Sequence, residues 1–584
     1  MKKTLLSLVL ILAVLRILSA APAYRGPVTR TQPDGSTIVT YIHGDEFGHW
    51  VSDAQGNELV QGEDGWWKPA ATEAAPSIQQ RAALRRAAAN ARRRSAPRRA
   101  SNFGSPRIPV ILVGFKDRAF SKSADDFDAL LNQEGYTQNG AVGSVSDYYK
   151  ENSLGAFTPV FDVYGPVQVD TTMAYYGTND YFGNDMRAEM ALVHAVQKLD
   201  DQIDFTQYDN DRDGQVDFIM FYYAGYDEAQ GANSKCIWSH AWMLSESSYA
   251  RDQAVYDGVQ IENYFCTAEL YGTWGSTLCR IGTTCHEFAH TLGLPDFYDT
   301  DNSSGGWGAN TYDLDLMSGG SYNADSTTPP YLNAEELWEV GWLSEIPVMD
   351  AAGPVTLGPV NHPGATGFTA RKLLTSTQDE YFLFEVRGGK RWDASIPEGM
   401  LVYHVDRSTR RIRGSTTAIS TWDANTVNNY SSHPCCYIVP ASNPTSTAEY
   451  NGSLSNLFFP RPGQTSYLPT DWNGAVTAWF LDGITYADGQ ASWVMKDARG
   501  ISATGYNYIA DPFEGVHHAG ESFPLTLVTA TGDKAPAGPV QWSVDGESVS
   551  EGAVTLPAGH HEIEATFTTE GGTTKKVLLE LDVQ

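Results

Sequence analysis

The sequence has few basic residues for its length. Among 584 residues, 40 are Lys or Arg and 70 are Asp or Glu, so the formal net charge is −30. Nucleic acid is therefore excluded as an expected partner, because contact with phosphates needs a basic surface. Long apolar runs are also scarce: beyond the N-terminal leader, no stretch approaches about 18 consecutive apolar residues, so the mature chain is not expected to span a membrane.

The first residues form the one apolar leader in the sequence. Lys2 and Lys3 precede an apolar run from Leu5 to Leu18, which only Arg16 interrupts. The run is too short and too charged for a membrane anchor. Small residues that offer cleavage sites follow it: Ser19, Ala20, Ala21 and Ala23. This pattern predicts a signal peptide over residues 1–23 and a secreted or extracellular protein.

Cysteine is scarce, with six residues and none before Cys236. In an exported chain, cysteines favour disulfides. At least one bond is predicted within a group of four, although the spacing does not choose the pairing: Cys236, Cys266, Cys279 and Cys285. A bond between the adjacent Cys435 and Cys436 would be strained, and it is not counted on. No arrangement specific to a cysteine nucleophile is present.

Composition and patterning divide the rest of the chain. Hydrophobic residues make up 42% and aromatic residues 12%, which excludes a disordered, collagen-like or coiled-coil chain. Residues 24–72 alternate apolar and polar positions, and an Arg-rich, helix-favouring stretch follows to residue 100. Apolar runs predict strands over 108–115 and 216–225, and helices are expected near 124–133, 186–200, 280–293 and 332–341. Alternating strands and helices are typical of an α/β or α+β unit, and with the β-rich regions on either side the predicted fold class of the chain is α+β.

The predicted domains follow from these patterns. After the signal peptide, residues 24–100 form a β-rich unit with an Arg-rich linker, and residues 101–345 form a unit of alternating strands and helices. Residues 346–500 form a β-rich accessory domain. Strand runs separated by Gly-containing turns predict a small immunoglobulin-like β-sandwich over 510–584.

The strongest chemical signal is CHEFAHTLGLPDFYD, residues 285–299. His286 and His290 are four apart, so on a helix they share a face and can bind one zinc ion. Glu287 can act as general base on a water at the metal. Gly293 can end the helix in a left-handed turn, which lets the chain reverse so that Asp296 supplies a third ligand.

A second signal is YDNDRDGQVD, residues 208–217. Alternate carboxylates with a Gly at the turn match the start of a calcium loop. The expected ligands are Asp209, Asp211, Asp213 and Asp217. Position twelve would be Met220 rather than Glu, and a strand follows where an EF-hand needs a helix, so the loop is not a complete EF-hand. Structural Ca²⁺ is predicted here, with a solvated acidic loop as the alternative.

These stretches resemble a known group. HExxHxxGxxD is the metzincin pattern with Asp in place of the usual third His. The sequence IGTTCHEFAHTLGLPDFYD resembles the immune inhibitor A family of secreted bacterial metalloproteases. DLMSGGSYN resembles that family's Met-turn, which would place Met317 beneath the metal. QPDGS and HGDEFGHW resemble its prosegment, and EYFLFEVR, WDASIPEGMLVYHVD and ANTVNNYSSH resemble its downstream region. The resemblance covers roughly residues 30–498 and implies a metzincin-like zincin fold.

Together these observations predict a secreted zinc-dependent endopeptidase that is made as a zymogen and hydrolyses proteins or peptides. The protein substrate class is implied by the resemblance. Tyr322 is a candidate oxyanion donor. Residues 24–100 are then the inhibitory prosegment and residues 101–345 the zinc metalloprotease catalytic domain, and trypsin-like cleavage at Arg94 or Arg99 would release the prosegment. That segment lacks Cys, so either a steric plug or a direct ligand must block the zinc; the candidate ligands are His43, Asp45, Glu46 and His49.

Two alternatives stay open at this point. One is a different zincin whose third ligand is Glu335 or Glu336. The other is a secreted adhesin or binding protein with a non-catalytic zinc site, which the immunoglobulin-like end and the acidic surface also fit. An intact Glu287 argues against it, because a structural zinc site needs no general base.

Overall fold

The computed structural model describes most of the chain after residue 101 and parts of the N-terminal region. The described residues are 19–20, 23–24, 26–45, 48–62, 64–70, 102–180, 184–247, 249–250, 254–300, 308–411, 418–461, 464–502, 506–513, 517–530, 538–568 and 574–584. The Arg-rich linker, with Arg94 and Arg99, and nearly all of the expected signal peptide lie outside them. No helix in the described part of the chain is long and apolar enough to cross a membrane.

A six-stranded mixed sheet forms the centre of the predicted catalytic domain, residues 101–345, which is called the catalytic part. Its order is β1-β10-β13-β9-β7-β8, and the strands are β1 (Ser19–Ala20), β7 (Arg107–Gly114), β8 (Val160–Gln168), β9 (Met220–Tyr226), β10 (His240–Met243) and β13 (Asn263–Leu270). Strands β8, β7, β9 and β13 run parallel, whereas β10 is antiparallel to β13. A short ribbon of β11 (Val255–Tyr256) and β12 (Val259–Gln260) stands beside it.

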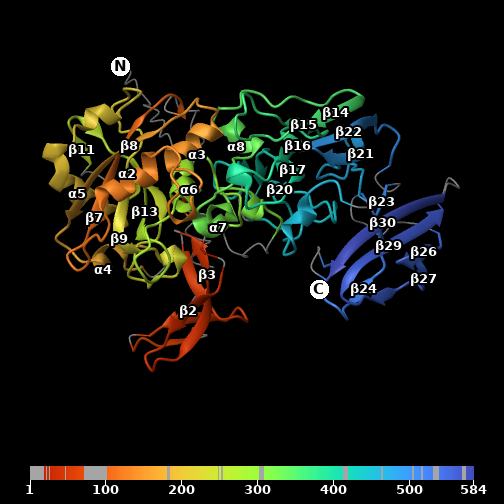
Figure 1. The fold of residues 1–584 in the computed structure, drawn as a ribbon, viewed down its shortest axis with the longest axis horizontal. Helices are drawn as coiled ribbons and strands as arrows, with labels where there is room; N and C mark the ends of the chain where they lie inside the picture. Colours follow the sequence, from red (N-terminus) through yellow and green to blue (C-terminus); the bar gives the residue numbers. More distant parts are fainter. Residues whose placement is uncertain are drawn as a thin grey trace, which may run out of the picture.

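Helices cover both faces of this sheet, which explains the continuous apolar run of β7. Leu112 lies in the core with α2 (Ala124–Asn132), α3 (Val145–Asn152) and α6 (Ile281–Thr291). Its neighbours Ile111 and Val113 point to the opposite core, with α4 (Met173–Gly177) and α5 (Ala188–Leu199). Figure 1 shows this sheet and its helices at one end of the molecule. The predicted mixed α+β class is confirmed at this level.

The helices begin where the sequence provides caps. Ser123 and Ser144 each form a capping box with the Asp three residues later, at the starts of α2 and α3. The expected helices are present as α2, α5, α6 and α8 (Ala334–Glu339), whereas α3, α4 and the short, irregular α7 (Asn323–Ser326) were not anticipated.

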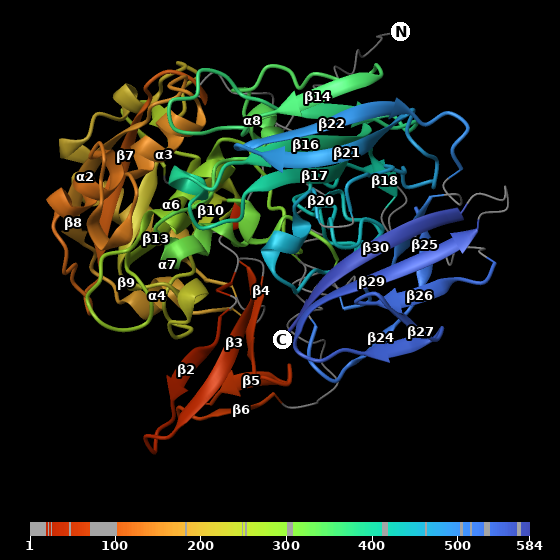
Figure 2. The same ribbon diagram turned by 45° about the vertical axis from the view of Figure 1, so that its right-hand side comes forward.

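The accessory part, residues 346–500 of the predicted accessory domain, consists of antiparallel sheets. One contains β15 (Arg371–Leu374), β16 (Glu380–Arg387), β17 (Gly399–Asp406) and β20 (Cys436–Ile438); another contains β14 (Gly353–Leu357), β22 (Gln490–Asp497) and β21 (Trp479–Ala487). A ribbon pairs β18 (Arg410–Arg411) with β19 (Ala418–Ile419). Figure 2 shows these sheets beside the catalytic part. Glu151 of α3 binds Arg391 and Trp392, so the two parts share a polar contact.

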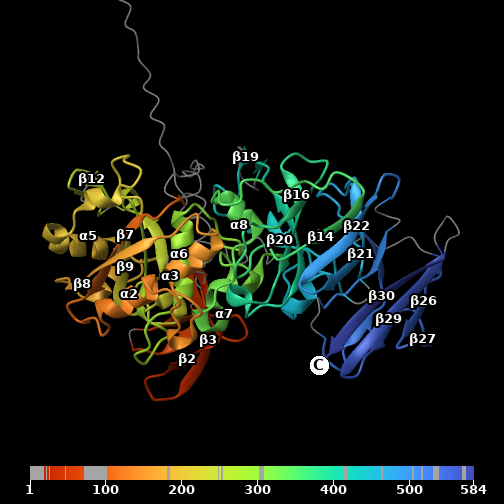
Figure 3. The same ribbon diagram turned by 45° about the horizontal axis from the view of Figure 1, so that its top comes forward.

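Two further strand-only units complete the described chain. The N-terminal sheet, β2 (Val28–Thr31), β3 (Thr37–Asp45), β4 (Gly48–Ser52), β5 (Glu58–Gln61) and β6 (Trp67–Pro69), projects from the molecule (Figures 1 and 2). The C-terminal unit contains β23 (Asn507–Ile509), β24 (Ser522–Pro524), β25 (Leu527–Thr529), β26 (Gln541–Val544), β27 (Glu547–Val549), β28 (Ala553–Thr555), β29 (Gly559–Thr568) and β30 (Thr574–Val583). Its core surrounds Trp542 and Ile563, beyond β21 and β22 (Figure 3).

The disulfide prediction is wrong for this structure. All six cysteines are free and buried. Their placement is part of the reason: Cys236 and Cys266 lie in the core on one face of the large sheet, whereas Cys279 and Cys285 lie in the core on the other face. The sheet therefore separates the two pairs, and burial raises the pKa of each of these four thiols.

Candidate metal centre

Helix α6 carries both predicted histidine ligands. It lies against the large sheet, with Phe288 fully buried beneath β13 and stacked on Phe265. On its other side the helix approaches the segment after Met317 very closely: a Cβ at Gly282 would lie 1.9 Å from the carbonyl oxygen of Ser321. Only glycine fits there, so Gly282 sets how near the helix comes to this segment.

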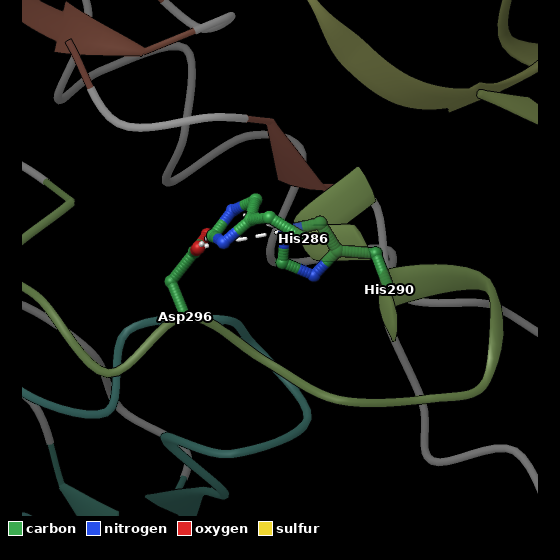
Figure 4. A group of neighbouring side chains, drawn as sticks. All are labelled: His286, His290 and Asp296. Carbon is green, nitrogen blue, oxygen red and sulfur yellow. Dashed lines mark hydrogen bonds and ion pairs between the residues drawn. The ribbon is translucent and has the colours of Figure 1, made fainter. Parts of the chain in front are cut away.

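The chain reverses immediately after the helix, as the sequence predicted. Gly293 has a φ of +110°, in the left-handed region, and the N–H of Leu294 donates to Ala289 O. This turn returns Asp296 to the histidines. Its Oδ1 lies 3.4 Å from His286 Nε2 and 3.5 Å from His290 Nε2. Figure 4 shows the three side chains pointing toward one another.

The hydrogen bonds of the two imidazoles suit a metal ion. Nδ1 of His286 bonds to Leu316 O and Nδ1 of His290 bonds to Leu294 O, each at 2.8 Å. A carbonyl can only accept, so each Nδ1 carries the proton and each Nε2 presents its lone pair to the centre. The two Nε2 atoms are 3.0 Å apart, near the roughly 3.3 Å expected between tetrahedral ligands of zinc. The facing lone pairs and the carboxylate fit a cation.

The segment around Met317 supports both ligand-bearing elements from below. Met317 is fully buried, and its carbonyl accepts from the N–H of Phe297, next to Asp296. Asp315 fixes the turn, since its Oδ1 accepts from Met317 N at 2.7 Å and its Oδ2 accepts from Asn333 Nδ2 at 2.6 Å. The turn predicted as a Met-turn therefore contacts the loop that carries Asp296.

The predicted base lies on the helix of the two histidines, and the predicted oxyanion donor, Tyr322, lies near enough to this base to interact with its charge. Glu287 is fully buried on α6, between the two histidines in sequence. Burial and the nearby negative charges of Asp227 and Glu287 raise the pKa of Tyr322 well above its usual value, so it remains a protonated donor. The Tyr322 ring packs edge-on against Tyr24 of the N-terminal unit, with centroids 5.7 Å apart.

The rival third ligands lie elsewhere. Glu335 accepts hydrogen bonds from Tyr381 and Arg407, and Glu336 forms the capping box of α8 with Asn333. Among the described residues, the group close enough to share one ion contains His286, His290 and Asp296, without either glutamate.

The acidic loop before β9 gathers three of its four predicted ligands. Asp209, Asp211 and Asp213 offer oxygens close enough to share one ion. Gly214 N and Asp213 N donate to Asp209, which rounds the loop around these carboxylates. Asp217 is not in this group: its Oδ2 accepts from the backbone and side chain of Asn210. It orders the start of the loop instead.

Two of the proposed blocking residues are described, and both have other partners. His43 Nε2 lies 2.8 Å from Ser52 Oγ within the N-terminal sheet. His49 Nε2 lies 3.0 Å from Glu228 Oε1 and 2.9 Å from Asn179 Nδ2 of the catalytic part. The side chains of Asp45 and Glu46 lie outside the described residues.

Sequence reasoning missed a set of asparagines from the accessory part. Asn425, Asn428 and Asn429 all bond to the loop that carries Asp296. They lie about 130 residues further along the chain than the Asp296 loop, so no local sequence pattern predicts their contact with it. The signal available was the polar stretch ANTVNNYSSH, which the sequence analysis treated only as a point of resemblance.

Comparisons with known proteins concern this same region. Residues 116–334 match the catalytic domain of immune inhibitor A peptidase M6. Immune inhibitor A of Bacillus thuringiensis subsp. alesti is 28% identical over 215 residues, which are 32% of this chain and 30% of that protein. Pre-pro-metalloprotease PrtV of Vibrio cholerae serotype O1 (strain M66-2) is 27% identical over 216 residues, 33% of this chain and 23% of that protein. The chain thus matches less than a third of each relative's length.

One solved structure aligns more widely but weakly. Wild-type OgpA from Akkermansia muciniphila aligns over 84% of this chain and 96% of that chain, at 8% identity and a TM-score of 0.23. At that score the alignment carries no argument about the fold.

Proposed function

The chain carries an immune inhibitor A peptidase M6 catalytic domain, and from that premise we propose that it is a secreted zinc endopeptidase made as a zymogen. The observation that carries the proposal is the convergence of His286, His290 and Asp296, with Glu287 on the same helix. In this proposal the three residues would hold zinc and leave a position for water.

Zinc in this site would supply a Lewis acid for the scissile carbonyl and lower the pKa of the attacking water. The chain's own residues do the rest. Glu287 accepts a proton from the attacking water and delivers it to the leaving amine. Tyr322 donates a hydrogen bond toward the oxyanion. The dry, buried surroundings of Glu287 exclude competing water from that proton transfer.

Strand β10 is the proposed docking edge for the substrate. Without β1 it is the edge of the large sheet, and edge strands pair readily with an extended peptide. In the structure Ser19 and Ala20 pair antiparallel with Ala241 and His240. These two residues belong to the expected signal peptide, so their place on the sheet would become free after export. Recognition through the backbone suits protein substrates of varied sequence.

The N-terminal sheet is the proposed inhibitory prosegment. Val28 and Ile42 pack with Ala229 and Trp238 of the catalytic part, and Tyr24 rests on Tyr322. These contacts support a steric plug beside the catalytic centre, and a direct ligand to zinc from Asp45 or Glu46 is the other form of the same proposal. Cleavage in the Arg-rich linker, at Arg94 or Arg99, would then let the sheet leave.

Calcium is proposed at the acidic loop, with Asp209, Asp211 and Asp213 as ligands and Asp217 as an ordering group. Three close carboxylates repel one another unless a cation bridges them. The loop leads directly into β9, so ordering it would anchor a central strand of the large sheet.

The finer domain assignments belong to the same proposal. We assign residues 1–23 to a signal peptide, 24–100 to the prosegment, 101–345 to a metzincin-like catalytic domain and 346–500 to an accessory domain. Residues 510–584 are proposed as an immunoglobulin-like β-sandwich, because their strands alternate buried and exposed positions around one core.

The deciding experiment is casein hydrolysis by the purified, trypsin-treated protein, with and without a zinc chelator. Hydrolysis that the chelator abolishes and zinc restores is the expected result. The Glu287→Ala variant serves as the inactive control. Absence of chelator-sensitive cleavage across varied protein substrates would favour the other candidate, an adhesin or binding protein with a non-catalytic zinc site, which the family match does not favour.

A further inference from the structure

Asn425 of the accessory part holds Asp296 at two points. The N–H of Asp296 donates to Asn425 Oδ1 at 2.6 Å, and Asn425 Nδ2 donates to Asp296 Oδ2 at 2.8 Å. Both residues are buried, each with about 1% of its surface exposed. The segment of the accessory part, teal in Figure 4, runs beside the loop that carries Asp296. One amide side chain therefore fixes both the backbone and the carboxylate of the third ligand.

This arrangement gives the two carboxylate oxygens different roles. Asn425 engages Oδ2, whereas Oδ1 is the atom that lies within 3.5 Å of both histidine Nε2 atoms. A carboxylate that accepts a hydrogen bond on one oxygen is held against rotation, which orients the other oxygen for a metal. Partners of this kind change metal affinity by about 10- to 100-fold in other proteins.

Asn425 is itself rigidly placed. Its φ is +50°, a left-handed conformation that Asn adopts more readily than most residues. Its N–H donates to Trp422 O, and its carbonyl accepts from Thr300 Oγ1. Asn428 adds a bridge from Phe297 O to Cys436 O, at the start of β20. Asn425 therefore lies in a turn between β19 and β20, and Asn428 of the same segment ties that turn to the start of β20.

We propose that Asn425 is a positioning residue for zinc, which makes the metal affinity of the catalytic part dependent on the accessory part. The inference rests on the proposed function, because it takes His286, His290 and Asp296 as the zinc ligands. It adds that the catalytic domain alone supplies an incomplete site, since the third ligand is oriented by a residue beyond the 116–334 match.

The test uses the full chain with Asn425→Gly. Glycine accepts the left-handed backbone without strain, so this change removes the amide and leaves the turn. Asn139→Gly is the matched control, because Asn139 also has a positive φ, of 57°, but is exposed and lies in the segment between α2 and α3. The zinc dissociation constant is measured by competition with a chromogenic chelator, and the site geometry by the visible absorption spectrum of the Co²⁺ form.

The expected result is zinc binding about 10- to 100-fold weaker in Asn425→Gly, with an altered Co²⁺ spectrum and no change in Asn139→Gly. Hydrolysis by Asn425→Gly should return when zinc is raised to saturation, which a misfolded protein would not show. Failure of that rescue would overturn the inference.

The Asn429→Ala variant distinguishes a specific role of Asn425 in positioning Asp296 from a general stabilisation of the loop that carries Asp296. The Oδ1 of Asn429 accepts from the N–H and the Oγ1 of Thr300 in that loop. Equal zinc loss in Asn429→Ala and Asn425→Gly would overturn a specific role for Asn425. If wild type binds zinc and Asn425→Gly binds it equally, the inference fails and the proposed function stands. If wild type itself binds no zinc, the proposed function fails.

Discussion

The imidazole of His49 stacks on the indole of Trp238, with ring centroids 4.2 Å apart and planes 24° from parallel. His49 belongs to β4 of the N-terminal sheet, and Trp238 lies just before β10 of the catalytic part. The same imidazole reaches Glu228, and both side chains are nearly fully buried. A histidine that the sequence offered as a zinc blocker is therefore an anchor between the two units.

Replacing His49 with Ala should loosen the prosegment. Removing one partner of a buried hydrogen-bonded pair costs on the order of 3 kcal/mol, or about a 100-fold shift toward the undocked state. Cleavage of a quenched peptide should then be measurable before any trypsin treatment. His43→Ala is the control, because that ring bonds to Ser52 and stacks on Trp50 within the N-terminal sheet. If both variants cleave the peptide equally slowly before trypsin treatment, His49 does not anchor the N-terminal sheet to the catalytic part.

Glu287→Gln should separate zinc binding from hydrolysis. The glutamine preserves shape but cannot accept a proton, so hydrolysis should fall by at least about 100-fold. The zinc content, measured by atomic absorption, should remain one ion per chain. Loss of the metal together with activity would show that Glu287 maintains the site rather than acting as its base.

Calcium should stabilise the folded chain through the acidic loop. Ligand at 100 times its dissociation constant adds about 2.7 kcal/mol to the free energy of unfolding, so the melting temperature of wild type should rise with calcium. In Asp211→Asn this rise should shrink, because a ligand charge is lost. Asp201→Asn, at an exposed position outside the loop, should respond like wild type. An undiminished rise in Asp211→Asn would place calcium elsewhere.

Acid should weaken the fold through His240. Burial lowers the pKa of this imidazole to about 4 in the folded state, whereas an unfolded histidine titrates near 6.5. Between those values the unfolded state binds more protons, so stability is complete above about pH 6.5 and is lost as the pH falls toward 4. The loss attributable to His240 is about 3 kcal/mol.

The measurement is the unfolding midpoint in urea between pH 4 and 7 for wild type and His240→Gln. The variant should show a shallower pH dependence over this window, whatever its stability at pH 7. His560→Gln is the contrasting control, because His560 is exposed and its hydrogen bond with Asp582 raises its pKa. Its removal should therefore not reduce the loss of stability between pH 7 and pH 4. Parallel curves for wild type and His240→Gln would contradict the assignment.

Local patterns predicted the parts of the fold and site that depend on neighbouring residues. The four-residue spacing of His286 and His290, and the left-handed turn at Gly293, follow from helix geometry and from glycine's backbone freedom. The buried run of β7 predicted its strand because both faces are covered. In each case the residues that determine the structure lie within about a dozen positions of one another.

What the sequence could not provide depends on contacts between distant segments. The four cysteines looked paired, but the sheet between Cys266 and Cys285 separates them. Asn425 meets Asp296 across 129 positions, and no period or spacing in the chain encodes that contact. Asp217 matched a calcium-loop position, and it also accepts hydrogen bonds from Asn210 on one of its two carboxylate oxygens, a contact that the calcium-loop pattern does not predict.

The identity of the third zinc ligand gives the sharpest remaining test of the site. Asp296→Ala should lose zinc and hydrolysis together, since two histidines alone bind zinc weakly. Glu335→Gln and Glu336→Gln should keep zinc, because Glu335 is engaged by Arg407 and Tyr381, and Glu336 caps α8. Their changes should appear in the melting temperature instead. Zinc retained in Asp296→Ala and lost in either glutamate variant would establish the other zincin, and Asn425 would then have no ligand to position.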